Sequence, residues 1–141
     1  MTYEEWEADV PAGIREDPLW SVEAYRLALF LSDLVWKDLT RLMRDRRTIG
    51  VADQVFRAAG SISANIAEGW SRGTAKDRAR FYEYALGSSR ETRDWYFKGR
   101  HVLKKEVVNH RIELSTRLVR LTTTMTANEH RTVRRIAPRA K

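Results

Sequence analysis

Two carboxylates, one amide and one guanidinium are the side chains in this sequence from which catalytic chemistry could be built. Asn65 and Glu68 lie three residues apart in an otherwise apolar run, so they share one face of a helix. Glu91 adds a second carboxylate, and paired carboxylates can do acid–base work. No nucleophile or second positioned group accompanies them. Because buried charges are costly unless paired, we predict instead a buried polar network that fixes helix register, in which Arg57 or backbone groups pair with Glu68 or Glu91.

Metal or cofactor chemistry has equally little support. The sequence contains no cysteine and three histidines, which are His101, His110 and His130. A di-iron helical bundle needs Glu-x-x-His on facing helices, whereas Glu106 and His110 are four residues apart and have no counterpart. Glycine-rich phosphate loops and nucleophile-elbow motifs are also absent from the sequence. We therefore predict no catalytic site, no metal and no cofactor, and a protein that is not an enzyme.

Basic side chains carry the clearest functional signal. The net charge is +7 and the sequence pI is about 10.0, a balance that suggests an anionic partner. Over residues 72–105 the basic side chains are interleaved with aromatic ones, a mixture that can track phosphates and stack bases. The predicted nucleic-acid-binding residues are Arg72, Lys76, Arg78, Arg90, Arg93, Lys98, Arg100, Lys104 and Lys105. The alternative is an ordinary solvated face, with the aromatic rings turned into the core or a subunit interface.

Four amphipathic helices would position these residues. Apolar side chains recur at helical spacing over residues 18–43, 51–70, 74–103 and a fourth segment that ends near residue 126. Asp17 is the expected N-cap of the first helix, with Pro18 at its first position, and Thr74 begins the third. A turn at 104–109 is expected before the fourth helix. The arginines of residues 41–47 then lie at the C-terminal end of the first helix, where cations suit the helix dipole.

No strand pattern competes with these helices, so we predict an all-α, up-down-up-down four-helix bundle over residues 18–127. The second helix is rich in alanine, serine and glycine, and we expect it in the middle of the bundle, enclosed by three partners. Before the bundle, residues 1–17 form an acidic segment with six carboxylates and one arginine. After it, residues 128–141 form a basic tail, which we expect to be mobile because Pro138 would end a helix.

Two motifs in the predicted second and third helices resemble those of a known family. They are Arg57-Ala-Ala-Gly-Ser-Ile-Ser-Ala-Asn-Ile-Ala-Glu-Gly69 and Arg80-Phe-Tyr-Glu-Tyr-Ala-Leu-Gly-Ser-Ser-Arg-Glu91. Over residues 20–127 the chain resembles the four-helix-bundle proteins encoded by intervening sequences inside bacterial 23S ribosomal RNA genes. The resemblance implies a homopentamer of four-helix protomers around a central channel. It also implies kinship with the accessory variability proteins of diversity-generating retroelements, which are basic pentameric barrels that bind a reverse transcriptase and nucleic acid.

These observations together predict a non-enzymatic, basic, oligomeric scaffold that binds RNA or single-stranded nucleic acid. A reverse transcriptase or another RNA-handling enzyme is the candidate protein partner. The alternative is a structural protein-interaction module without nucleic-acid binding, whose partners are acidic proteins. The longest uncharged run, residues 58–67, is too short to span a membrane, and the N-terminus lacks a signal-peptide pattern. Since the sequence also lacks cysteine, we expect a cytoplasmic protein without membrane contact.

Overall fold

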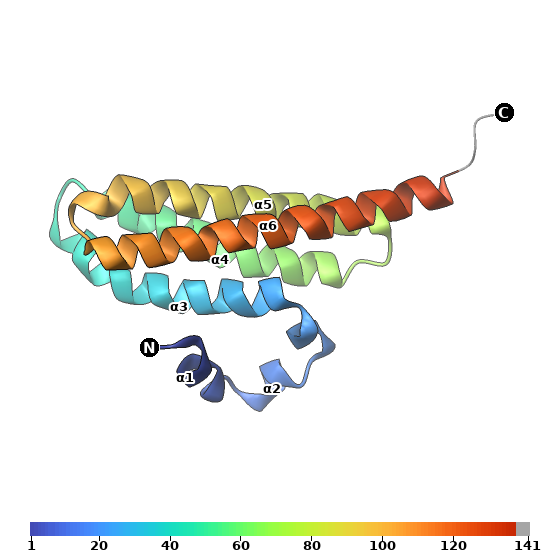
Figure 1. Cartoon of the computed structure of the whole chain (residues 1–141), viewed down its shortest axis with the longest axis horizontal. Coiled ribbons are helices and arrows are strands. Elements are labelled where there is room, and N and C mark those ends of the chain that lie inside the picture. Colours follow the sequence, from blue (N-terminus) through green and yellow to red (C-terminus); the bar gives the residue numbers. More distant parts are fainter. Residues whose placement is uncertain (138–141) are drawn as a thin grey trace.

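The structure is a computed structural model that describes residues 1–137, and over those residues the chain is helical and contains no strand (Figure 1). Four long helices form the body of the molecule: α3 (Glu23–Arg44), α4 (Ile49–Trp70), α5 (Ala75–Lys98) and α6 (Lys105–Ile136). Short connections make successive helices antiparallel, and α6 packs against both α5 and α3. The all-helical prediction is confirmed. None of the described helices is long and apolar enough to cross a membrane.

One face of each long helix contributes to the bundle core. On α4, the buried apolar residues include Ala52, Val55, Ala59, Ile62 and Ile66, as helical spacing predicts. The opposite face of α4 is not enclosed, because this helix packs chiefly against α3 and α5. The prediction that α4 is surrounded by three partners is therefore wrong within one chain. Instead, α4 occupies a corner of the four-helix array, and small residues lie on its outer face as well as its inner one.

The first long helix starts later than predicted. Asp17 does cap a helical turn, since its carboxylate accepts a hydrogen bond from the backbone N–H of Leu19 at 2.8 Å. Pro18 occupies the first position of that turn, again as expected. The turn is, however, a short 3-10 helix, η1 (Pro18–Ser21), that is not continuous with α3. The α-helix begins only at Glu23.

The third long helix is capped as predicted but is shorter. The Thr74 hydroxyl accepts a hydrogen bond from the backbone N–H of Asp77 at 3.2 Å. The helix then ends at Lys98, and a second 3-10 turn, η2 (Gly99–His101), follows it. The glycine of this turn approaches α3 closely, because a Cβ added there would lie 3.0 Å from the side chain of Leu42. The turn after α5 is thereby held against the end of α3.

The last long helix extends further than predicted at both ends. It begins at Lys105, where a turn over 104–109 was expected, and it continues to Ile136. Two polar contacts hold its added turns on α5. They are the ion pair between Arg78 Nε and Glu129 Oε2 at 3.0 Å, and the hydrogen bond between His130 Nε2 and Glu83 Oε1 at 2.8 Å. The tail predicted to be mobile is therefore helical up to Ile136, and Pro138 lies outside the described residues.

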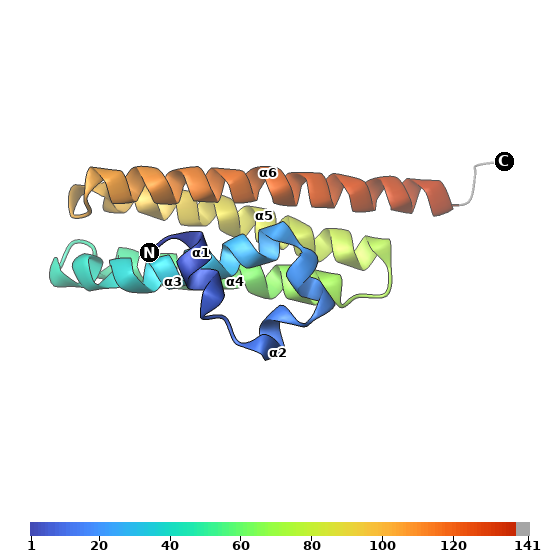
Figure 2. The same cartoon turned by 60° about the horizontal axis from the view of Figure 1, so that its bottom comes forward.

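The N-terminal segment is folded onto the bundle. We call residues 1–22 the N-terminal arm; besides η1 it contains two short helices, α1 (Tyr3–Ala8) and α2 (Ala12–Arg15) (Figure 2). Trp6 is only 7% exposed, and its ring centroid lies 5.4 Å from that of Phe30 on α3. Its indole N–H also donates a hydrogen bond to the Asp33 carboxylate at 2.6 Å. The acidic segment therefore packs against α3 through an aromatic anchor.

Candidate nucleic-acid interface

The nine predicted nucleic-acid-binding residues lie in three separate places. The first group surrounds the connection between α4 and α5, the second lies on the second half of α5, and the third surrounds the connection between α5 and α6 (Figure 1). In chain order the groups are Arg72, Lys76 and Arg78; Arg90 and Arg93; and Lys98, Arg100, Lys104 and Lys105. The first and third groups lie at opposite ends of the bundle. The structure therefore does not gather all nine residues into one patch.

The first group is largely used within the chain. Arg72 Nη2 lies 3.0 Å from Glu68 Oε2, and Arg78 Nε lies 3.0 Å from Glu129 Oε2. The Arg78 side chain is only 26% exposed and also donates a hydrogen bond to the backbone carbonyl of Arg72 at 3.2 Å. Lys76 is exposed. This end consequently offers fewer free positive charges than the sequence indicates.

The opposite end of the bundle gathers more positive charge. Half of its basic residues are the arginines of residues 41–47, which were expected only to complement the dipole of the first helix. We call this end the basic end and define it as residues 41–48 and 98–105. Because neighbouring helices are antiparallel, α3 ends where α5 ends and α6 begins. Arg41 and Arg44 accordingly line a shallow hollow together with Val102 from the α5–α6 connection. The alternating helix order was the sequence signal that could have joined the two clusters.

Within the basic end, eight lysines and arginines accompany one carboxylate. That carboxylate, Asp45, accepts hydrogen bonds from the Arg47 side chain and backbone, which lower the pKa of Asp45 to about 2. Lys98 pairs with Asp94 at 2.7 Å, just outside the basic end. Six exposed basic side chains of the basic end form no ion pair among residues 1–137, and they are Arg41, Arg44, Arg46, Arg100, Lys104 and Lys105. The basic end therefore holds charge that the fold does not neutralise.

An exposed aromatic ring lies beside the basic end. Phe97 is 53% exposed, and the Arg100 guanidinium lies 4.0 Å from its ring centroid. Both residues line a groove of ≈ 510 Å³ between α5 and α6. A second hollow of ≈ 610 Å³ shares Phe97 and Ile112 with the first and is also lined by Arg90 and Arg93. Phe97 thus lies between the second and third groups of predicted basic residues.

The other aromatic side chains of α5 mostly face inward. Tyr82 and Tyr96 are buried, and Trp95 is half-buried with Lys98 Nζ 4.6 Å from its ring centroid. For these three rings the structure favours the alternative interpretation, in which they belong to the core. Base stacking at this surface therefore depends on Phe97.

The predicted polar network of Arg57, Asn65, Glu68 and Glu91 does not form as a buried cluster within one chain. Arg57 lies 3.8 Å from Asp53 and Glu68 lies 3.0 Å from Arg72, and both are exposed pairs one helical turn apart. Asn65 donates a hydrogen bond to a backbone carbonyl one turn earlier, and Glu91 is exposed. The corner position of α4 explains this, because it leaves the outer faces of α4 and α5 uncovered. Among residues 1–137 no group of three or more His, Cys, Asp or Glu side chains could hold a metal ion.

A buried ion pair near the basic end was not foreseen from the sequence. Asp38 of α3 accepts hydrogen bonds from Arg111 Nε at 2.8 Å and Nη2 at 3.1 Å, and from the Tyr96 hydroxyl at 2.7 Å. The side chains of Asp38 and Arg111 are only 8% and 11% exposed. Burial, reinforced by the Asp38 charge, raises the pKa of Tyr96 well above its ordinary value. Because the three groups satisfy one another, this cluster ties α3, α5 and α6 together and has a structural role.

Comparisons with known proteins bear on the fold and the family. A solved structure of a protein with unknown function, from the S23 ribosomal protein family of Bacteroides thetaiotaomicron, is similar over 73% of this chain and 97% of that chain. The sequence identity is 19% and the TM-score is 0.68, so the likeness shows a shared fold. A comparison with curated proteins finds no match. The family model described as 23S rRNA-intervening sequence protein matches residues 21–124.

The matched region contains both motifs noted in the sequence and the helices α3, α4 and α5 in full. It leaves out most of the N-terminal arm and the last turns of α6. Because the match covers well over half of the chain, this protein belongs to the 23S rRNA-intervening sequence protein family.

Proposed function

We propose that this protein is a non-enzymatic, oligomeric scaffold that binds RNA or single-stranded nucleic acid at its basic end. The observation that carries the proposal is the composition of residues 41–48 and 98–105, where eight lysines and arginines accompany one carboxylate. Such side chains neutralise phosphates and release their counterions, so the cluster favours nucleic acid over uncharged ligands. Phe97 beside it offers an exposed ring on which an unpaired base can stack, which favours single strands.

We also propose that the chain assembles into a homopentamer through the outer faces of α4 and α5. Gly60 and Gly87 lie inside these helices, where glycine costs about 1 kcal/mol relative to alanine. A Cβ added at either position would meet no atom within 4 Å, so packing within the chain gives no reason for glycine there. Close approach of a neighbouring chain would supply a reason. The exposed side chains of Phe56 and Tyr84, one turn away, would be buried in the same contact.

A ring of five copies would repeat the basic end around one assembly. Weak phosphate contacts from several copies then act on the same strand, which raises the avidity without any new contact. Such a scaffold could hold an enzyme on RNA. We propose a reverse transcriptase or another RNA-handling enzyme as the partner, from the resemblance to the accessory variability proteins of diversity-generating retroelements. The cytoplasm is the proposed location, since a reducing compartment suits a chain without cysteine.

Charge reversal at the basic end tests the proposed site. Lys104→Glu with Lys105→Glu reverses two exposed lysines at the start of α6. Arg80→Glu with Arg120→Glu, at exposed positions outside the predicted binding residues, makes the same change in net charge. We expect the first variant to bind fluorescent single-stranded RNA about tenfold more weakly or worse, with a salt slope smaller by about two. The control variant should lose less than about threefold in affinity for the RNA, because its charges lie away from the contact.

Equal losses in the two variants would mean that net charge governs binding, and the basic end would then be the wrong site. If the unaltered oligomer binds no RNA at low salt, the nucleic-acid function is wrong, and the protein-interaction module becomes the better account. Native mass spectrometry of the unaltered protein counts its copies and tests the pentamer separately.

A further inference from the structure

The N-terminal arm carries negative charge that the rest of the chain does not use. Residues 1–17 contain six carboxylates and one arginine. None of these six carboxylates forms an ion pair within the described part of the chain. Glu5 and Asp17 accept hydrogen bonds from backbone N–H groups at the starts of their own helices. The arm therefore presents an acidic surface whose carboxylates remain available to a cationic partner.

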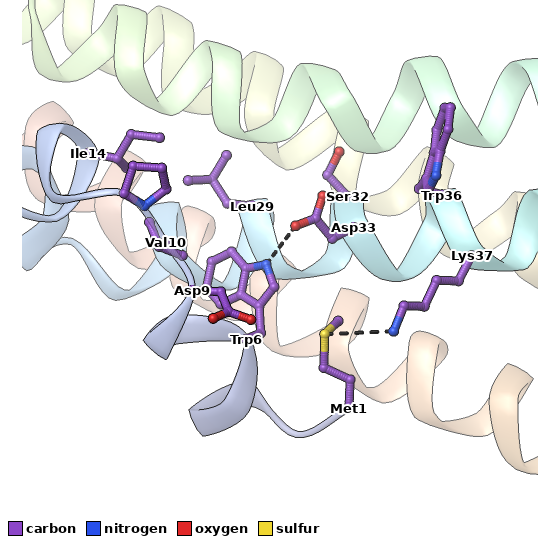
Figure 3. A pocket seen from close by; sticks show the side chains of 11 residues that line it. Met1, Trp6, Asp9, Val10, Ile14, Leu29, Ser32, Asp33, Trp36 and Lys37 are labelled. Atoms are coloured by element: carbon purple, nitrogen blue, oxygen red, sulfur yellow. Dashed lines mark hydrogen bonds between the residues drawn. The ribbon is translucent and has the colours of Figure 1, made fainter.

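An apolar groove of ≈ 510 Å³ lies between the arm and α3 (Figure 3). Trp6, Val10 and Ile14 line it from the arm, and Leu29 and Trp36 line it from α3. Trp36 is 66% exposed and Ile14 is 39% exposed, so much of this apolar lining faces solvent. Apolar surface of this kind, rimmed by charged residues, is typical of an interaction site. The groove is thus suited to an apolar side chain carried on a basic segment.

The end of α6 is such a segment. We call residues 131–136 the α6 overhang; it contains three arginines and no carboxylate, and it ends in Ile136, which is 73% exposed. Figures 1 and 2 both show this end of α6 projecting past the bundle, away from the arm of its own chain. The overhang therefore cannot fill the groove of its own chain without a large rearrangement.

We propose that the groove between the arm and α3 binds the α6 overhang of a second copy of this chain. Ile136 fills the apolar groove, and the arginines of the overhang face the carboxylates of the arm. The two partners have opposite charge, and each is left unpartnered in the single chain. Most of the arm and all of the overhang lie outside the matched region, residues 21–124, and neither belongs to the faces of α4 and α5 proposed above as the pentamer interface.

The contact joins two different surfaces, the arm of one copy and the overhang of the next. Such a head-to-tail contact generates a closed ring when its rotation closes, and otherwise an open chain of copies. With a closing rotation, the contact would reinforce the cyclic assembly proposed above. Because its charges are near the surface, the contact should weaken as salt is raised over the range in which the Debye length falls below about 10 Å.

Disulfide trapping tests the contact directly, because the chain has no cysteine of its own. We expect a mixture of Ile14→Cys and Ile136→Cys chains to form a cross-linked heterodimer under mild oxidation, since any disulfide between the two variants must join different chains. Glu113→Cys, at an exposed position on α6, replaces Ile136→Cys in the control mixture and should give no heterodimer. A cross-link of equal yield in both mixtures, or none in either, would overturn the proposal.

Charge exchange provides a second measurement on the full chain. Reversal of the overhang (Arg131→Glu, Arg134→Glu, Arg135→Glu) should raise the concentration at which the oligomer dissociates by about tenfold or more, measured by analytical ultracentrifugation. Reversal of the arm (Glu4→Lys, Asp9→Lys, Glu16→Lys) should do the same. A chain carrying both reversals should regain the original value, because the charges are again complementary. If neither reversal changes assembly, or if the combined chain is worse than both, the groove binds something other than a second copy.

Discussion

We expect Asp38→Asn to be one of the most destabilising single substitutions in the bundle. Asp38 accepts two hydrogen bonds from Arg111 and one from Tyr96. Asparagine keeps the shape of the side chain but removes its charge, so the guanidinium of Arg111, only 11% exposed, becomes a buried cation without a counter-charge. Removing one partner of a buried ion pair costs about 3–5 kcal/mol.

That cost is large for a domain whose free energy of unfolding is roughly 5–15 kcal/mol. A chain of this length loses about 2–4 °C in Tm per kcal/mol, so Tm should fall by roughly 10 °C. Urea denaturation followed by circular dichroism measures the free energy of unfolding, and an unchanged m-value would show that the two proteins unfold between comparable states.

A double-mutant cycle separates the ion pair from general damage to the core. Arg111→Met removes the buried cation, so adding it to Asp38→Asn should cost little more than Asp38→Asn alone, with a coupling energy of about 3 kcal/mol. The matched control is the exposed pair of Lys98 and Asp94, whose side chains are both 54% exposed. There the cycle Asp94→Asn with Lys98→Met should give a coupling below about 0.5 kcal/mol. A loss below about 1 kcal/mol for Asp38→Asn, or additive effects with Arg111→Met, would refute the buried tie.

Three other contacts yield further predictions. The raised pKa of Tyr96 adds to the free energy of unfolding in full below pH about 10, and this contribution is lost as pH rises. Tyr96→Phe should therefore reduce the loss of stability at alkaline pH in urea titrations, and an unchanged loss would contradict this. Gly69→Ala should cost about 1–3 kcal/mol in thermal unfolding, because the new Cβ would lie 2.7 Å from a tyrosine ring of α5, whereas Gly60→Ala has open space and should cost nothing in the monomer. Trp6→Phe deletes the hydrogen bond to Asp33 and should speed proteolytic cleavage of the arm severalfold; unchanged cleavage would mean that this bond does not hold the arm.

Local sequence pattern predicted the parts of the fold that local forces determine. Helix α4 was expected at 51–70 and lies at Ile49–Trp70, because its buried residues recur with the period of a helix. The cap at Thr74 was identified because a threonine before a helix has a specific partner three residues on. The end of α6 was missed, since its last turns are held by contacts to α5 and not by a periodic apolar stripe.

The contacts between helices were less predictable, because the two residues of each contact are distant in sequence. Asp38 and Arg111 are 73 residues apart, and Trp6 and Asp33 are 27 residues apart, so no local pattern relates either pair. The polar network of Arg57, Asn65, Glu68 and Glu91 was wrongly predicted to be buried for a related reason. Its residues lie on the outer faces of α4 and, for Glu91, of α5, which have no neighbour within the chain. A sequence motif does not state whether a face is covered by the same chain or by another.

The basic end has two explanations, stabilisation of the helix ends and binding of an anionic ligand. The two lysines at the start of α6 help to separate them. A helix C-terminus carries partial negative charge, so Arg41, Arg44 and Lys98 are stabilised at the ends of α3 and α5 whether or not a ligand binds. Lys104 and Lys105 lie instead at the N-terminus of α6, where the helix dipole disfavours positive charge. Helix stability therefore does not account for these two lysines, and glutamates in their place should leave the fold at least as stable. An anionic ligand would give them a role, which is why their reversal separates binding from folding.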